Sequence, residues 1–186
     1  MLENWGGHIS AAIYLLGKDD TKKVHEAIAR NSKLQEYVDF HLVTATEVYA
    51  FKQLGLYPVN SLRNEAMMKA RTSHILVLDV DFVVNDEAYQ NIHAFMPFIT
   101  ENPLTAFVVP AFEMTSPEYE KTIPKNRAEL VEMGTSKIRQ VHRDKWDPAH
   151  KPTNYDRWAV ADDFYEIFWM SEYEPYIIIS KEAAPK

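Results

Sequence analysis

Two aspartates separated by one residue, Asp79 and Asp81, are the side chains in this sequence of 186 residues whose types and spacing best suit chemistry. They directly follow the apolar run at residues 75–78, which is typical of a buried strand. In an extended segment, residues i and i+2 point the same way, so both carboxylates can converge on one hard divalent cation, which prefers oxygen ligands. Ligands of open α/β sheets bind outside the carboxyl ends of strands. The pair is therefore predicted to hold a cation that acts as a Lewis acid on phosphate oxygens.

The D-x-D spacing alone is also compatible with two different roles. Aspartates are common where strands end in turns, so the pair can be structural. A D-x-D after a strand also supplies the aspartyl nucleophile of haloacid-dehalogenase-like phosphatases, and Asp162 and Asp163 resemble the later acidic pair of that fold. Against a phosphatase, the motif lies in mid-chain instead of on the first strand, and Phe82 and Val83 replace the small hydroxyl residue expected after it.

The elements around the D-x-D alternate between strands and helices. Apolar runs predict strands at residues 9–16, 37–44, 74–78, 105–111 and 173–180, and helical periodicity predicts helices at about 21–35, 58–70 and 86–99. The nearly continuous apolarity of residues 74–78 indicates burial on both faces of that strand. The gaps between strands are long enough for parallel crossovers. We therefore expect an α/β, Rossmann-like fold with a mostly parallel central sheet flanked by helices.

Residues 116–163 differ in character from the rest. Four prolines, at positions 117, 124, 148 and 152, interrupt the segment, which mixes helical stretches such as residues 126–133 with aromatic loops. We interpret it as a substrate-facing insertion within a single domain that covers residues 1–186, because the chain has 46% hydrophobic residues and no linker-like segment.

Composition narrows the partners of the chain. The net charge of −7 arises from 27 acidic and 20 basic residues without a basic stripe, so nucleic acid is not expected as a partner. The absence of cysteine excludes disulfides and thiolate metal sites. The sequence has no apolar run of 18 residues and no signal-peptide pattern at its start, so we expect no membrane segment in this chain.

Five stretches carry a resemblance to a known family. They are residues 57–64 (YPVNSLRN), 74–82 (HILVLDVDF), 108–113 (VVPAFE), 150–158 (HKPTNYDRW) and 173–176 (YEPY). In this order they closely resemble glycosyltransferase family 49, which includes the LARGE-like enzymes and the β-1,4-glucuronyltransferases that build the dystroglycan matriglycan. The resemblance implies a GT-A type fold and inverting transfer from a UDP-sugar to a glycan or glycoprotein acceptor in the Golgi lumen. The resemblance suggests glucuronic acid as the donor sugar and xylose as the acceptor.

The resemblance also implies roles for four residues near the D-x-D. Asp79 and Asp81 correspond to the metal-binding pair, with Mn²⁺ (or Mg²⁺) as the cofactor, and Asp79 also belongs to the donor site. Arg63 and Asn64 match the L-R-N stretch of the family and are expected to contact the uridine or the phosphates. The alternative for these two is that they are exposed polar positions on an amphipathic helix.

The acceptor side is predicted from five residues. Glu113 ends a strand, as Asp79 does, and is a candidate for the base that an inverting transfer needs. A capping or ion-pairing role is the alternative for Glu113. Aromatic faces and hydrogen-bonding groups suited to a sugar ring come together in one stretch, at His150, Tyr155, Arg157 and Trp158. Aromatic packing in a loop-rich region explains that stretch equally well.

The chain departs from the family after the E-P-Y strand. Family members continue into an aspartate- and glycine-rich segment and a later histidine that completes the metal site, whereas this sequence stops at Lys186. We therefore expect a fragment or a truncated member, with one metal ligand missing and little activity on its own. A module that binds a nucleotide or a glycan without turnover is the corresponding alternative.

Overall fold

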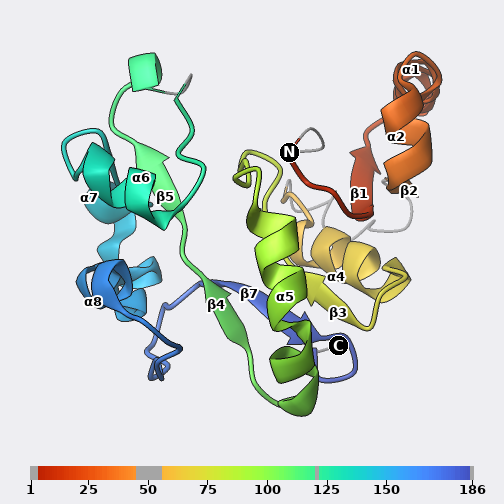
Figure 1. The fold of residues 1–186 in the computed structure, drawn as a ribbon. Helices are drawn as coiled ribbons and strands as arrows, with labels where there is room; N and C mark the ends of the chain where they lie inside the picture. Colours follow the sequence, from red (N-terminus) through yellow and green to blue (C-terminus); the bar gives the residue numbers. More distant parts are fainter. Residues whose placement is uncertain (1–3, 45–55, 120–121, 185–186) are drawn as a thin grey trace.

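The computed structural model describes residues 4–44, 56–119 and 122–184, which form a mixed α/β structure (Figure 1). The strands of these residues make three small sheets, and seven α-helices accompany them. The α/β class predicted from the sequence is confirmed. In the same residues, no helix has both the length and the apolar character needed to cross a bilayer.

The first sheet pairs β1 (Ile9–Leu15) with β2 (Val38–Thr44) in parallel, as the alternation predicts. The connection contains two helices, α1 (Lys18–Ala29) and α2 (Ser32–Tyr37), where the periodicity predicted one. The break occurs because the side chain of Asn31 accepts hydrogen bonds from the backbone of Lys33 and Leu34 and so starts a new helix.

The second sheet contains the strand that precedes Asp79 and Asp81. Its order is β3 (His74–Leu76), β7 (Tyr176–Ser180), β4 (Phe107–Val109). The helix α4 (Val59–Lys69) leads into β3, and α5 (Ala88–Glu101) connects β3 to β4. Both β3 and β4 pair antiparallel to β7, whose Ile178 is only 6% exposed. The prediction of a mostly parallel central sheet is therefore wrong for the described residues. The strands β3 and β4 run in the same direction, as the alternation of strands and helices predicts. The last strand, β7, lies between them and runs in the opposite direction.

The strand β3 is less buried than its apolarity predicted. It lies at the edge of its sheet, and all three of its residues are half-buried. A cavity of about 410 Å³ adjoins it, lined by residues of β1, α4, β3 and α5 that include Ser10, Met67 and Ile92. Burial on both faces is thus not found, because β3 is an edge strand and the cavity adjoins it.

The third sheet pairs β5 (Phe112–Met114) antiparallel with β6 (Ile138–Gln140). Short helices accompany it: η1 (Pro117–Tyr119), α6 (Arg127–Met133), α7 (Arg143–Trp146), η2 (Asp147–Ala149), η3 (Lys151–Thr153) and α8 (Tyr155–Val160). Figure 1 shows this group at the left, joined to the remainder by β4 and β7. The helix predicted near 126–133 is confirmed, whereas β5, β6 and α8 were not predicted. That residues 116–163 form a substrate-facing insertion stays a prediction.

Candidate functional site at the end of strand β3

The D-x-D lies in a turn that directly continues β3. The backbone amide of Val77 still donates to Ile177 of β7, at 3.3 Å, so the pairing extends one residue past the strand. The amide of Phe82 then donates to the carbonyl of Asp79, at 3.2 Å, which closes a turn over Val80 and Asp81. The two carboxylates are therefore positioned by a turn and not by the extended geometry expected from their spacing.

Three elements meet at the carboxylate of Asp79. Arg63 of α4 places a guanidinium nitrogen 2.6 Å from Asp79 Oδ1. The hydroxyl of Tyr176, the first residue of β7, donates to Oδ2 at 3.1 Å. The side chains of Asp79 and Arg63 are 37% and 43% exposed, so the site is open to a ligand. Asn64 follows Arg63 on α4 and is half-buried.

The ring of Tyr176 is enclosed by other aromatic rings. Its centroid lies 4.7 Å from that of Phe82, at the end of the D-x-D turn, and 5.7 Å from the ring of His150, nearly parallel to it. Burial raises the pKa of the Tyr176 hydroxyl, and the nearby negative charges of Asp79 and, more weakly, Asp81 raise it further.

The side chains of Asp79 and Asp81 are of the kind that binds hard cations. Two carboxylates offer oxygen ligands, and a positive group, the Arg63 guanidinium, already lies against one of them. Within residues 4–44, 56–119 and 122–184, no group of three or more His, Asp and Glu side chains is arranged to hold a metal ion. The two aspartates could therefore hold a cation only together with oxygen ligands from outside the described residues.

The carboxylate of Glu113 on β5 is held by two donors. Its Oε1 accepts from Arg139 Nε at 3.0 Å, and its Oε2 accepts from the backbone amide of His142 at 3.3 Å. Arg139 also pairs with Asp144, at 2.6 Å, and these contacts, that with Asp144 first, raise the pKa of Arg139. This arrangement matches the ion-pairing alternative for Glu113. The two contacts use one lone pair on each oxygen of Glu113.

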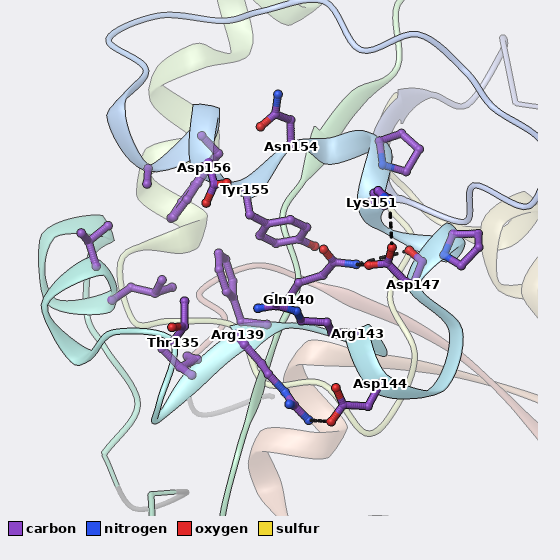
Figure 2. Close-up of a pocket in the computed structure, with 18 of the residues that line it drawn as sticks. Thr135, Arg139, Gln140, Arg143, Asp144, Asp147, Lys151, Asn154, Tyr155 and Asp156 are labelled. Atoms are coloured by element: carbon purple, nitrogen blue, oxygen red, sulfur yellow. Dashed lines mark hydrogen bonds and ion pairs between the residues drawn. The ribbon is translucent and has the colours of Figure 1, made fainter.

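A broad groove of about 1,170 Å³ opens among β6 and the short helices that follow it (Figure 2). Charged pairs edge it: Arg139 with Asp144, and Lys151 with Asp147 at 3.3 Å. Of the four predicted sugar-binding residues, Tyr155 and Trp158 line this groove. Both rings also pack against Phe112, each with a centroid distance of 5.1 Å.

The other two predicted sugar-binding residues lie elsewhere. Arg157 places its guanidinium over the ring of Tyr165, 4.4 Å from the centroid. His150 is 3% exposed, next to Tyr176 and His142. Burial and then the charge of His142 lower the pKa of His150, which favours a neutral ring. The structure thus places His150 against Tyr176, beside the D-x-D turn, and Tyr155 and Trp158 at the groove.

Sequence reasoning gave Tyr176 no role, although it belongs to the YEPY stretch. The only feature of the sequence that could have indicated a role for Tyr176 is its position at the start of an apolar strand. Its contact with Asp79, 97 residues away, depends on the antiparallel insertion of β7 beside β3. No local pattern indicates that pairing.

Comparisons with known proteins agree with the resemblance. Residues 44–185 match the model of the family described as glycosyl-transferase for dystroglycan. Similar proteins include the glycosyltransferase-like protein gnt14 of Dictyostelium discoideum, 32% identical, and the xylosyl- and glucuronyltransferases LARGE2s of Danio rerio, 31%, and LARGE1 of Homo sapiens, 30%. Each alignment covers 97% of this chain but only 28%, 23% and 23% of the respective relative. The chain therefore spans about a quarter of the length of these relatives.

Proposed function

The chain belongs to the family of glycosyl-transferases for dystroglycan, and from that premise we propose that it forms the donor-binding part of a metal-dependent, inverting transferase of the GT-A type. The donor is a UDP-sugar, with glucuronic acid as the sugar, and the acceptor is a glycan or glycoprotein that ends in xylose. The Golgi lumen is the compartment that accords with this activity. The matched proteins are transferases, which argues against the phosphatase alternative.

One observation carries the proposal: the carboxylate of Asp79 lies just after β3 against a cationic side chain, and Asp81 lies in the same turn. Two carboxylates and one guanidinium form a site for a cation and an anion together. A metal-bound diphosphate is such a ligand, since its cation binds carboxylates and its oxygens bind arginine.

In the proposed reaction, Asp79 and Asp81 hold Mn²⁺ or Mg²⁺, which, when bound, stabilises the negative charge that the leaving diphosphate gains. Arg63 binds phosphate oxygens from α4, and Asn64 beside it contacts the nucleotide. The partly exposed position of Arg63 allows its guanidinium to turn from Asp79 towards the diphosphate.

We assign the acceptor to the groove, where Tyr155 and Trp158 offer aromatic faces to a sugar ring. Glu113 is the proposed base, and it lies on β5 beside the groove residue Arg139. In that role Glu113 exchanges its contact with Arg139 for the acceptor hydroxyl and takes the proton of that hydroxyl as the new glycosidic bond forms.

Calorimetry of UDP binding tests the metal site. Wild-type chain should bind UDP more tightly in Mn²⁺ than in chelator, and Asp79→Asn and Asp81→Asn should lose this difference. Asp86→Asn, an exposed aspartate five residues further along, is the matched control and should keep it. Equal UDP affinity for wild type and both variants in Mn²⁺ would show that the two aspartates are structural.

A module that binds without turnover is the second candidate, and the small number of carboxylates favours it. Asp79 and Asp81 are two ligands where a metal centre ordinarily has more, and the described residues offer no third in a cluster. Incubation with UDP-glucuronic acid, a xyloside and Mn²⁺ separates the two: release of UDP with glycoside formation indicates the transferase, and UDP binding without product indicates the module.

A further inference from the structure

Tyr176 is the described side chain that links the D-x-D to the group of elements around the groove. Its hydroxyl donates to Asp79 Oδ2, its ring packs on Phe82 at the end of the turn, and it stacks on His150, which lies between η2 and η3. It is also the first residue of the strand that pairs with β3. The pairing of β7 with β3 thus holds the backbone of Tyr176, the carboxylate of Asp79 holds its hydroxyl, and Phe82 and His150 pack against its ring.

We propose that Tyr176 is the positioning residue of the donor site: it holds one oxygen of Asp79 so that the other faces the ligand. This inference rests on the proposed function for its ligand, but the hydrogen bond itself does not depend on it.

The two oxygens of Asp79 differ in what holds them. The Oδ2 atom is bound by a half-buried hydroxyl whose ring is confined by Phe82 and His150, so that contact has little freedom. The Oδ1 atom is bound by Arg63, a partly exposed and flexible side chain that can leave. Tyr176 therefore fixes the plane of the carboxylate, and Oδ1 is the oxygen available for exchange.

The ring and the hydroxyl of Tyr176 make separate contacts, so their roles can be tested separately. The ring alone accounts for the packing on Phe82 and His150. The hydroxyl, in contrast, is directed to a carboxylate that is itself 37% exposed, where water would otherwise serve as the donor. Partners that orient a metal-binding carboxylate typically contribute about 10- to 100-fold to metal affinity.

Tyr176→Phe separates the hydroxyl from the ring, and Tyr173→Phe is the matched control. Tyr173 is a buried tyrosine three residues earlier, whose hydroxyl bonds to Thr153 at 3.0 Å. Titration with Mn²⁺, followed by the electron paramagnetic resonance signal of the free ion, should show affinity reduced about 10-fold or more in Tyr176→Phe and unchanged in Tyr173→Phe. UDP affinity in chelator should be the same in all three proteins.

A double-mutant cycle tests the contact without any metal. Urea unfolding of wild type, Tyr176→Phe, Asp79→Asn and the double variant, all in chelator, should give a coupling between the two positions that differs from zero. Zero coupling, or wild-type Mn²⁺ affinity in Tyr176→Phe, would overturn the positioning role. A wild-type chain that binds no Mn²⁺ while the coupling persists would overturn the proposed metal site and, with it, the role of Tyr176 towards a cation.

Discussion

Arg63 and Tyr176 contact the same carboxylate, and a bound cation would affect them differently. The hydrogen bond from Tyr176 is compatible with a cation at the other oxygen, whereas the guanidinium of Arg63 occupies the place that such a cation would take. Under the proposed function, Arg63 would therefore weaken the binding of a metal alone. It would strengthen the binding of a metal together with a diphosphate, which offers the guanidinium new oxygen partners.

Arg63→Gln should accordingly have opposite effects on two ligands. Mn²⁺ alone should bind about 1.4- to fivefold more tightly, because a partly exposed ion pair of about 0.2–1 kcal/mol no longer competes with it. Binding of UDP in Mn²⁺ should weaken, because a phosphate partner is lost. Paramagnetic resonance measures the first and calorimetry the second. Arg71→Gln, which removes an exposed arginine paired with Asp39, is the control and should change neither affinity.

Glu113→Gln distinguishes an ion-paired residue from a base. The geometry predicts a stability loss of about 1–2 kcal/mol, because a part-buried charged contact with Arg139 becomes a neutral one. UDP affinity should stay at the wild-type value. Urea unfolding measures the loss, with the exposed Glu132→Gln of α6 as the control. An unchanged stability combined with abolished transfer would show that the contact with Arg139 is dispensable and that Glu113 acts as the base alone.

At the scale of elements, β7 contributes more to the sheet than β3. Ile178 lies on the central strand and is buried, whereas Leu76 lies on the edge strand beside a cavity and is half-buried. Ile178→Ala should therefore cost about 2–5 kcal/mol of unfolding free energy, and Leu76→Ala clearly less, because the part of its surface that faces the cavity has little packing to lose. Chemical denaturation of both variants measures the difference. Equal losses would mean that the space beside β3 is filled in solution.

The sequence predicted well the elements whose formation is local. The strands β1 and β2 and the helices α4 and α6 lie close to their predicted ranges, because apolar periodicity and turn residues act over neighbouring positions. The sequence also predicted correctly that Asp79 and Asp81 directly follow a strand. The place of β7 was not, because its pairing with β3 joins residues about 100 positions apart.

The same limit applies to the site residues. Types and spacing indicated carboxylates for a cation, but the partners of each carboxylate come from other elements. Arg63 reaches Asp79 from α4, and Arg139 reaches Glu113 from β6. The elements β5, β6 and α8 were not predicted, because each contains only three to six residues and none stands out as a long apolar run or a helical period.

At the scale of the whole molecule, two histidines with lowered pKa values lie in different parts of the fold. Burial and then the charge of Lys69 lower the pKa of His41 on β2, and burial and then His142 lower that of His150. In the unfolded chain both return to an ordinary pKa of about 6.5. Below that pH the unfolded chain binds protons that the folded chain does not, so stability should fall as the pH falls through about 6.5 to the folded pKa values.

Unfolding free energies at pH 7.5 and pH 5.5 measure this effect. The difference between the two should shrink in His150→Gln and in His41→Gln. It should shrink further when both changes are combined, since His41 lies on β2 and His150 lies between η2 and η3. His25→Gln, at an exposed position of α1, should leave the difference as in wild type. An unaltered difference in both single variants would assign the pH dependence to other groups.

The stack of His150 on Tyr176 connects two places that a transferase must fill together. Pro148 of η2 and Lys151 of η3 line the groove on either side of His150, and Tyr176 holds Asp79. If the proposed function is correct, a ligand that shifts η2 and η3 would also shift the balance of conformations at Asp79. Occupancy of the groove and occupancy of the donor site would then be thermodynamically linked. Such linkage is reciprocal: the factor by which an acceptor in the groove changes donor affinity equals the factor by which the donor changes acceptor affinity.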